Sequence, residues 1–426
     1  MLVVGLVLAS ALLRSYPDNE RSLLWASFGL HTLSAVAVIV IVRGVYGSGD
    51  MFGYFQAGKF FAGRLRSDFF DMGPRLIEIL FQRSPPLPFP GIMAGSNTGS
   101  MQAISGFICL FSGESIYGAC LLVAFVSFVA KLALFNAMKT GLPEVPSARL
   151  AVACMLVPSA VFWSSGLLKE PIAVAGLSAM VHGGSAIVHR NRWLSGMLYV
   201  VGGGVVAGLF KGYLLPPFGI GAGFYYVSRA FFASGRTIQP RFLVLGVVVA
   251  LLSVLITGAA LPHFAPETFA EEAHDAQAIG QRVTGGSTYS YGEGSLISQV
   301  PLALATVLYR PLVFEASSPL MFISALETLA AAILTIIGLS RTPLNVTVRD
   351  ILVRPALCFC LGFVLTLAVG VGLTSTNLGT LSRYRVPLVP FYATLLMVLA
   401  NRRAAATSPL TPATPLDARF TRRRAL

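Results

Sequence analysis

The stretch FLVLGVVVALLSVLITGAAL, residues 242–261, decides the fold class. It is long enough for an α-helix to cross about 30 Å of hydrocarbon, and it contains no charged side chain. Stretches of the same kind recur along the chain, which predicts a helical membrane protein. We predict further spans at 22–43, 115–137, 148–162, 169–188, 193–210, 212–231, 318–340, 353–373 and 386–401.

The composition agrees with this prediction. The mean hydropathy is +0.74, 55% of the residues are hydrophobic and 12% are charged. We therefore expect an all-α, polytopic integral membrane protein with about 10–11 transmembrane helices, the first a short one at 2–13. The apolar stretches 101–113 and 297–313 are short and are typical of re-entrant or interfacial segments. One domain should cover 1–402, followed by a disordered, basic cytoplasmic tail at 403–426.

The basic residues predict the orientation. Most of the Lys and Arg residues in loops fall on one side of the predicted spans, which the positive-inside rule makes the cytoplasmic side, together with the C-terminus. The loops 44–114, 163–169, 262–317 and 374–385 then lie on the non-cytoplasmic side. Topology and anionic lipid account for the net charge of +13, so no nucleic-acid partner is needed to explain it.

Cysteine and histidine give no sign of a metal site. The five cysteines all lie in apolar stretches and lack metal-ligand spacing with the scattered histidines. We expect the cysteines to be packing residues and predict no metal ligands in the chain; the cofactor prediction is no certain cofactor, with a divalent cation as an open alternative.

The first outer loop contains GSGDMFGYFQAGK, residues 47–59. Apolar residues recur at spacings of three and four after Asp50, which predicts an amphipathic helix on the membrane surface. Asp50 is either a plain helix cap or a general base at the bilayer surface. Tyr54 on the same helix is a candidate substrate-binding residue.

Two very short outer turns carry cations. Lys169 and Glu170 lie in FWSSGLLKEPIAVAG, residues 162–176, and Lys211 lies in a turn between two later spans. A cation on the outer side opposes the topological bias, so a lipid phosphate is a candidate ligand for both lysines. Glu170 near a helix start suits the helix dipole, and Lys211 could equally extend toward headgroups.

The long outer segment 262–300 is rich in Gly, Ser and Tyr and contains Arg282. Its composition is typical of a mobile substrate-covering loop or of an unspecialised exposed loop. Arg310 and Glu315 follow in LYRPLVFEASSPLMFISALE, residues 308–327, where they form either a structural pair or part of a substrate site.

The stretch SRYRVPLVPFYATLL, residues 382–396, carries Arg383, Tyr384 and Arg385 just before the last span. Two arginines on the outer face could form a clamp for phosphate or pyrophosphate, or anchor the chain to headgroups. Within the spans, we expect Lys131 to extend toward the cytoplasmic surface and Glu327 to face the bundle interior, with no function assigned to either.

Together, the four quoted motifs resemble the GT-C superfamily of membrane glycosyltransferases. The 382–396 stretch is similar to the Arg-Tyr-Arg-x-Pro-x-x-Pro ending of relatives of the protein O-mannosyltransferase group. Residues 162–176 and 308–327 resemble multi-span proteins of bacterial polysaccharide gene clusters. The resemblance covers about 45–400.

The resemblance implies a donor sugar on a polyprenyl phosphate, transferred to a hydroxyl acceptor on the outer face of the bacterial inner membrane. It implies that Asp50 is the base and that Lys169, Arg383 and Arg385 bind phosphate, with Lys211 and Arg310 as further candidates. No paired acid stands directly beside Asp50, so the metal dependence is open. The bilayer and polysaccharide assembly machinery would be the partners.

Three alternatives remain. A lipid-linked repeat-unit polymerase or ligase would use the same face with a glycan–pyrophosphate donor. A transporter or flippase would be expected to show inverted repeats and mid-membrane charges, and a non-catalytic assembly partner is the third.

Overall fold

A computed structural model describes residues 1–47, 49–86, 91–232, 238–260, 266–282, 288–291 and 294–400. These residues form helices, and the β contact that they contain is an isolated bridge between Thr288 and Asn377. The predicted all-α class is confirmed. The predicted tail at 403–426 lies outside the described residues.

The helices follow one another closely. The first half contains α1 (Leu2–Leu13), α2 (Asp18–Ile41), the π-helical turn η1 (Val42–Tyr46), α3 (Asp50–Ser67), α4 (Phe69–Leu80), α5 (Asn97–Ser112), α6 (Ile116–Gly141), α7 (Ser147–Ala151), the π-helical turn η2 (Val152–Leu156), α8 (Pro158–Trp163) and α9 (Lys169–Arg190). The second half contains α10 (Trp193–Lys211), the 3₁₀ turn η3 (Gly212–Leu214), α11 (Leu215–Phe232), α12 (Pro240–Ala260), α13 (Pro266–Arg282), α14 (Leu296–Tyr309), η5 (Val313–Glu315), α15 (Pro319–Arg341), α16 (Leu344–Leu352), α17 (Pro355–Thr374), α18 (Leu378–Tyr384) and α19 (Val389–Ala400).

Seven helical stretches among the described residues are long and apolar enough to cross a membrane: Asp18–Gly44, Ile116–Gly141, Lys169–Arg190, Trp193–Phe232, Pro240–Ala259, Pro319–Arg341 and Pro355–Thr374. One of them, Trp193–Phe232, has 40 residues, which as a straight helix would measure about 60 Å. The η3 turn divides it into α10 and α11, the two spans expected from the sequence.

The other predicted spans correspond to shorter apolar helices at Leu2–Leu13, Ser147–Leu156 and Val389–Ala400. The span predicted at 148–162 is interrupted before Pro158, which begins α8. Proline lacks the N–H that a continuous helix would use at this position. The multi-pass character is thus confirmed, by length and composition of the helices.

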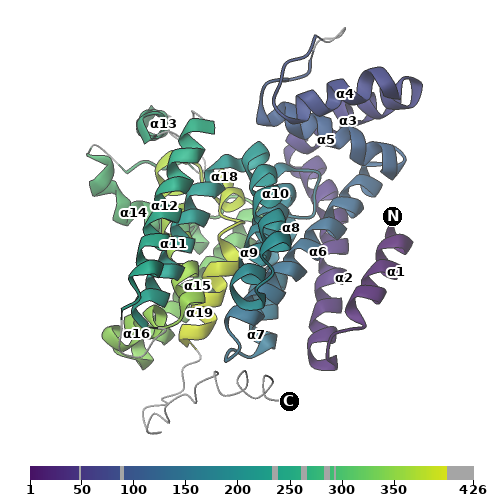
Figure 1. Cartoon of the computed structure of the whole chain (residues 1–426). Coiled ribbons are helices and arrows are strands. Elements are labelled where there is room, and N and C mark those ends of the chain that lie inside the picture. The colour runs from purple at the N-terminus through teal and green to yellow at the C-terminus, as the bar shows by residue number, and fades with distance from the viewer. Residues whose placement is uncertain are drawn as a thin grey trace, which may run out of the picture.

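The helices α3, α4 and α5 gather at one end of the bundle (Figure 1). As predicted, Met51, Tyr54, Phe55 and Phe61 share a face of α3, but that face is buried in the protein. Its main neighbour is α5, the helix that contains the stretch 101–113. A Cβ added to Gly58 would lie 2.7 Å from the carbonyl oxygen of Ser105, so α3 and α5 cross in close contact.

The described residues of the outer segment 262–300 are largely helical. The segment contains α13, which packs on α17, and the start of α14, which packs on the same helix. The sequence of α13, PETFAEEAHDAQAIGQR, is rich in Ala, Glu and Gln, which favour helix over extended loop.

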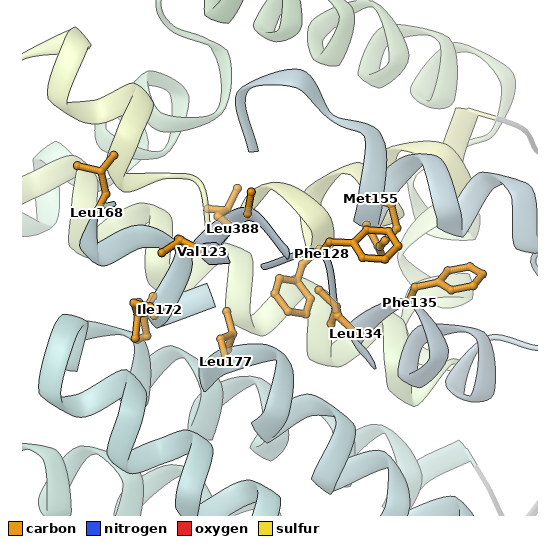
Figure 2. Close-up of a cluster of buried hydrophobic side chains, with 14 of the residues drawn as sticks. Val123, Phe128, Leu134, Phe135, Met155, Leu168, Ile172, Leu177 and Leu388 are labelled. Carbon is orange, nitrogen blue, oxygen red and sulfur yellow. The ribbon is translucent and has the colours of Figure 1, made fainter. Parts of the chain in front are cut away.

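The core lies where α6, α9 and η2 meet, and Figure 2 shows part of it. Phe128 and Phe135 of α6 are fully buried and lie near Met155 of η2. Ile172 and Leu177 of α9 cover the other side. This contact anchors the first turns of α9 in the core.

The helices α9 and α10 form a close antiparallel pair. A Cβ on Gly176 of α9 would stand 2.7 Å from the carbonyl oxygen of Gly203 of α10, and Gly183 faces Gly196 in the same way. Glycine at each crossing lets the two backbones touch, as small residues do between membrane helices. The first turn of α9 therefore lies beside the last turn of α10.

The opposite end of the bundle carries the basic loops. Lys139 at the end of α6 pairs with Glu20 at the start of α2, and Arg354 pairs with Glu144 at 3.4 Å. Arg341 donates a hydrogen bond to the carbonyl of Ala400. These contacts bring together loops that the charge pattern assigned to one common side.

Candidate polar site

Arg383 is the centre of a polar cluster at the α3–α5 end of the bundle. Its Nε donates to Oε1 of Glu170 at 2.6 Å, and its Nη1 donates to Oδ2 of Asp50 at 3.0 Å. Asn377 caps α18 by accepting the N–H groups of Gly379 and Thr380, which fixes the short helix that carries Arg383. Three segments far apart in the sequence thus meet at one guanidinium.

Asp50 is the first residue of α3, and Gly49 occupies the cap position. Its carboxylate pairs with Arg383 while 56% of the side chain stays exposed. An exposed carboxylate oxygen at the mouth of a polar cluster can accept a proton from a hydroxyl that binds next to it. Asp50 therefore does not act as the cap of α3, and its carboxylate belongs to the polar cluster.

Glu170 and Lys211 form the buried floor of the cluster. The Nζ of Lys211 lies 2.8 Å from Oε1 of Glu170, and both side chains are at most 5% exposed. The antiparallel pairing of α9 with α10 brings these two residues together. Glu170 therefore contacts two cations, and it orients Arg383 from the side opposite to Asp50.

Lys169 lies beside this pair with neutral partners. Its Nζ donates to Oδ1 of Asn97 at 2.7 Å and to Oγ1 of Thr98 at 2.9 Å, and it stands 5.9 Å from the ring of Tyr54. No carboxylate of the described part of the chain lies within ion-pair distance of this amine. Lys169 thus supplies a positive charge that protein carboxylates do not neutralise at close range.

Aromatic rings surround the cations. The ring of Tyr384 lies 4.6 Å from Nζ of Lys211, and the ring of Tyr213 lies 5.5 Å from it. Trp163 stands 6.0 Å from the guanidinium of Arg383. These rings restrict access of water and strengthen the local charges.

The neighbouring carboxylates keep Arg383 ionised. Burial alone would lower the pKa of Arg383, but the carboxylates of Glu170 and Asp50 outweigh burial and raise that pKa above its ordinary value. Burial, with a further contribution from Asp50, raises the pKa of Tyr54 to about 12. Arg383 is therefore a permanent cation, and Tyr54 is a neutral hydroxyl at physiological pH.

An apolar groove of about 250 Å³ lies next to the cluster. It runs between α2, α8 and α15, and Trp163 belongs to its lining. The rest of the lining is apolar or small: Leu30, Ser34, Ala37, Ile41, Pro158, Ser159, Val161, Phe162, Leu320, Ile323 and Ser324. The same tryptophan thus faces the groove and the central arginine.

Arg310, Glu315 and Arg385 form a second group. The Nε of Arg310 donates to both carboxylate oxygens of Glu315, at 2.9 and 3.1 Å, as the structural-pair alternative predicts. Arg385 is buried and donates from Nη1 to the carbonyl of Arg310 at 2.9 Å and from Nη2 to that of Ser324 at 3.4 Å. Arg385 makes no hydrogen bond or ion pair to the first cluster among the described residues.

The structure therefore brings together most of the site residues predicted from the sequence. The members of the cluster are Asp50, Tyr54, Lys169, Glu170, Lys211, Arg383 and Tyr384. The side chain of Arg282 lies outside the described residues. The sequence did not predict Asn97 and Thr98 as partners of Lys169, because uncharged polar residues at a helix start are common. It did not predict Tyr213 either, because tyrosine is common at the ends of membrane spans.

Glu327 and Lys131 both lie within long apolar helices. Glu327 faces the interior as predicted, where Oε1 accepts the N–H of Ser159 at 2.6 Å. The prediction for Lys131 was wrong, because its amine is buried and donates to the carbonyl of Ala160 at 2.8 Å and to Oγ of Ser164 at 2.6 Å. The carbonyl end of α8 gives this amine acceptors inside the bundle.

No group of three His, Cys, Asp or Glu side chains suited to a metal occurs among the described residues. At the cluster, Asp50 is the carboxylate with an exposed oxygen that could contribute to a divalent cation brought by a phosphate.

Comparisons with family models, with characterised proteins and with solved structures find no match to this chain. The fold and the site define a class: a multi-pass, all-α protein with the helices of a membrane protein and a cationic cluster at one end of its bundle.

Proposed function

We propose that this protein is a membrane glycosyltransferase that moves a sugar from a polyprenyl-phosphate carrier to a hydroxyl acceptor. The observation that supports the proposal is the position of Arg383. Its guanidinium contacts the exposed carboxylate of Asp50 and lies beside Trp163, which lines the apolar groove. A base, a phosphate-binding cation and an apolar path meet there, which are the three elements that this reaction needs.

The phosphate would bind between Arg383 and Lys169. Arg383 offers planar N–H donors, and Lys169 offers a point charge that is held by neutral oxygens alone. As the glycosidic bond breaks, negative charge builds on the departing phosphate, and fixed cations lower the barrier by stabilising that charge. The groove along α2, α8 and α15 would hold the first part of the prenyl chain.

Asp50 would take the proton of the acceptor hydroxyl. Its exposed side chain can reach a bound acceptor, and its location at the phosphate site would direct that acceptor to the sugar carbon. Glu170 is a positioning residue, because it is buried under Arg383 and does not face the solvent.

The cellular orientation is part of the proposal. In this proposal the basic loops at the opposite end of the bundle face the cytoplasm, and the polar cluster would face the non-cytoplasmic side of a bacterial inner membrane. The repeat-unit polymerase is less favoured, because it would be expected to carry several arginines in two outer loops, whereas the outer segment 262–300 contains a single arginine, Arg282.

The test is Asp50→Asn in cells that lack the natural copy, with the protein level in the membrane measured. We expect loss of the cell-surface glycan, together with accumulation of polyprenyl-phosphate sugar in extracted lipids. Asp71→Asn is the matched control, since Asp71 is an exposed carboxylate of the same layer that pairs with Arg75. Unchanged glycan and unchanged donor lipid in Asp50→Asn would contradict the proposal.

A further inference from the structure

A second cavity, of about 240 Å³, lies between η2, α14, α15 and α19. It is separate from the groove at Trp163, although Pro158 contributes to both. Among its lining residues two are charged, Glu327 on α15 and Arg385 just before α19. The remaining walls are largely aliphatic, with side chains such as Val152, Leu308, Ala331 and Leu334.

The two charged groups are close enough to interact but do not make an ion pair within 4.0 Å. Glu327 accepts one N–H, from Ser159. Arg385 donates its two terminal nitrogens to carbonyls, while its Nε is buried and has no hydrogen-bond partner in the described part of the chain. Arg385 is 4% exposed, so water outside the protein does not satisfy that N–H.

An unsatisfied donor of this kind is expensive in a low-dielectric interior. A half-buried carboxylate near a buried guanidinium also favours an occupant between them that can donate to one and accept from the other. The two protein charges cancel, so an occupant with a net charge would leave one charge without compensation. The chemistry therefore favours a neutral group with a hydroxyl.

The size and lining of the cavity indicate the chemistry of the rest of the occupant. A volume of about 240 Å³ would hold about eight waters at roughly 30 Å³ each, but most of the lining offers them no hydrogen bonds. Ala330 of the lining is exposed, so the cavity reaches the side of the bundle that lies within the membrane. An aliphatic chain can enter from there.

We propose that this cavity binds a neutral, hydroxyl-bearing lipid, with the hydroxyl between Glu327 and Arg385 and the hydrocarbon along α15 and α19. The hydroxyl accepts from Nε of Arg385 and donates to the carboxylate of Glu327. The site is independent of Asp50 and of the transferase proposal, because no residue that touches the phosphate or the acceptor takes part in it.

The experiment uses the full-length protein in vesicles of phosphatidylethanolamine and phosphatidylglycerol. The probes are dodecanol, dodecane and dodecyl phosphate, each carrying the same photoreactive diazirine, and the labelled peptides are identified by mass spectrometry. We expect dodecanol to label the peptides around Ala331 and Leu396 at least about tenfold more than dodecane, the factor that hydrogen bonds to charged groups provide. An excess of unlabelled dodecanol should abolish the labelling.

Ala331→Trp fills the cavity, and we expect it to reduce the dodecanol labelling by about tenfold. Leu329→Trp is the matched control, because Leu329 lies on the same helix, is 46% exposed and does not line the cavity. Its labelling should stay within about twofold of the unmodified protein, while Glu327→Gln should weaken the preference for the alcohol.

Three results would overturn the proposal. Equal labelling by dodecane would mean simple exposure to lipid, and stronger labelling by dodecyl phosphate would mean an anion site. If an excess of unlabelled dodecanol does not reduce the labelling, the cavity holds water alone.

Discussion

Glu170→Gln tests whether the buried floor of the cluster is held by charge. Glu170 is fully buried and contacts Lys211 at 2.8 Å and Arg383 at 2.6 Å. The substitution leaves Lys211 as a buried cation without its carboxylate, which typically costs about 3–5 kcal/mol. At about 1.4 kcal/mol per factor of ten, the unfolding equilibrium would shift by roughly a hundredfold to a few thousandfold.

The double variant Glu170→Met with Lys211→Met separates charge from packing. Replacement of both members of a buried pair by apolar side chains of similar size is often neutral or stabilising. We therefore expect the double variant to be more stable than Glu170→Gln alone, although Arg383 then has Asp50 as its one carboxylate partner among the described residues. Lys59→Met changes an exposed lysine and is the control, with an expected effect below about 0.5 kcal/mol.

The five cysteines supply the assay, because all are free and buried in the folded protein. A dye that fluoresces on reaction with thiols reports their exposure during heating in detergent. Glu170→Gln should expose its cysteines at a clearly lower temperature than the unmodified protein and the Lys59 variant. A Glu170→Gln profile equal to that of the unmodified protein would refute the reasoning, and so would a double variant less stable than the single one.

Three further outcomes are expected. Gly58→Leu should separate α3 from α5, since even a Cβ would lie 2.7 Å from the carbonyl of Ser105, and should cost about 1–3 kcal/mol in the thiol assay; Gly63→Leu, with open space around it, is its control. Lys169→Met should weaken binding of the carrier lipid about tenfold, measured with a fluorescent prenyl phosphate, while Lys59→Met should not. Burial would raise the pKa of Glu315, but hydrogen bonds from Arg310 and from the N–H of Leu312 outweigh burial and hold it below its ordinary value. Its contribution to stability is thus complete above the unfolded pKa of about 4.3 and is lost as the pH falls through the folded pKa, so Glu315→Gln should flatten the acid side of the stability profile.

Hydropathy predicted the long helices well, because a span must satisfy its backbone internally and must present apolar side chains over a fixed length. Hydropathy did not predict the break of the helix at Pro158. The apolar run continues through it, but the chain starts a new helix at the proline. Hydropathy measures side chains and does not register the missing N–H.

The predicted membrane topology assigned Asp50, Lys169, Lys211 and Arg383 to one side of the membrane. In the structure they meet at one end of the bundle. The topology could not predict that Glu170 lies beneath these residues, because the position of Glu170 depends on the glycine contacts between α9 and α10. The expected clamp of Arg383 with Arg385 is not formed. Residues two apart on a helix point about 200° away from each other, so the two guanidiniums face different groups.

The two carboxylates on Arg383 differ in how easily a ligand could remove them. Asp50 is half-exposed, and ion pairs of such groups contribute about 0–1 kcal/mol in water. Glu170 is enclosed and also bound to Lys211, so it stays in place. An incoming phosphate would therefore exchange with Asp50 at the arginine while the underlying helices keep their positions. Under the transferase proposal, arrival of the donor would itself release the base, so that Asp50 becomes available for an acceptor once there is a sugar to transfer.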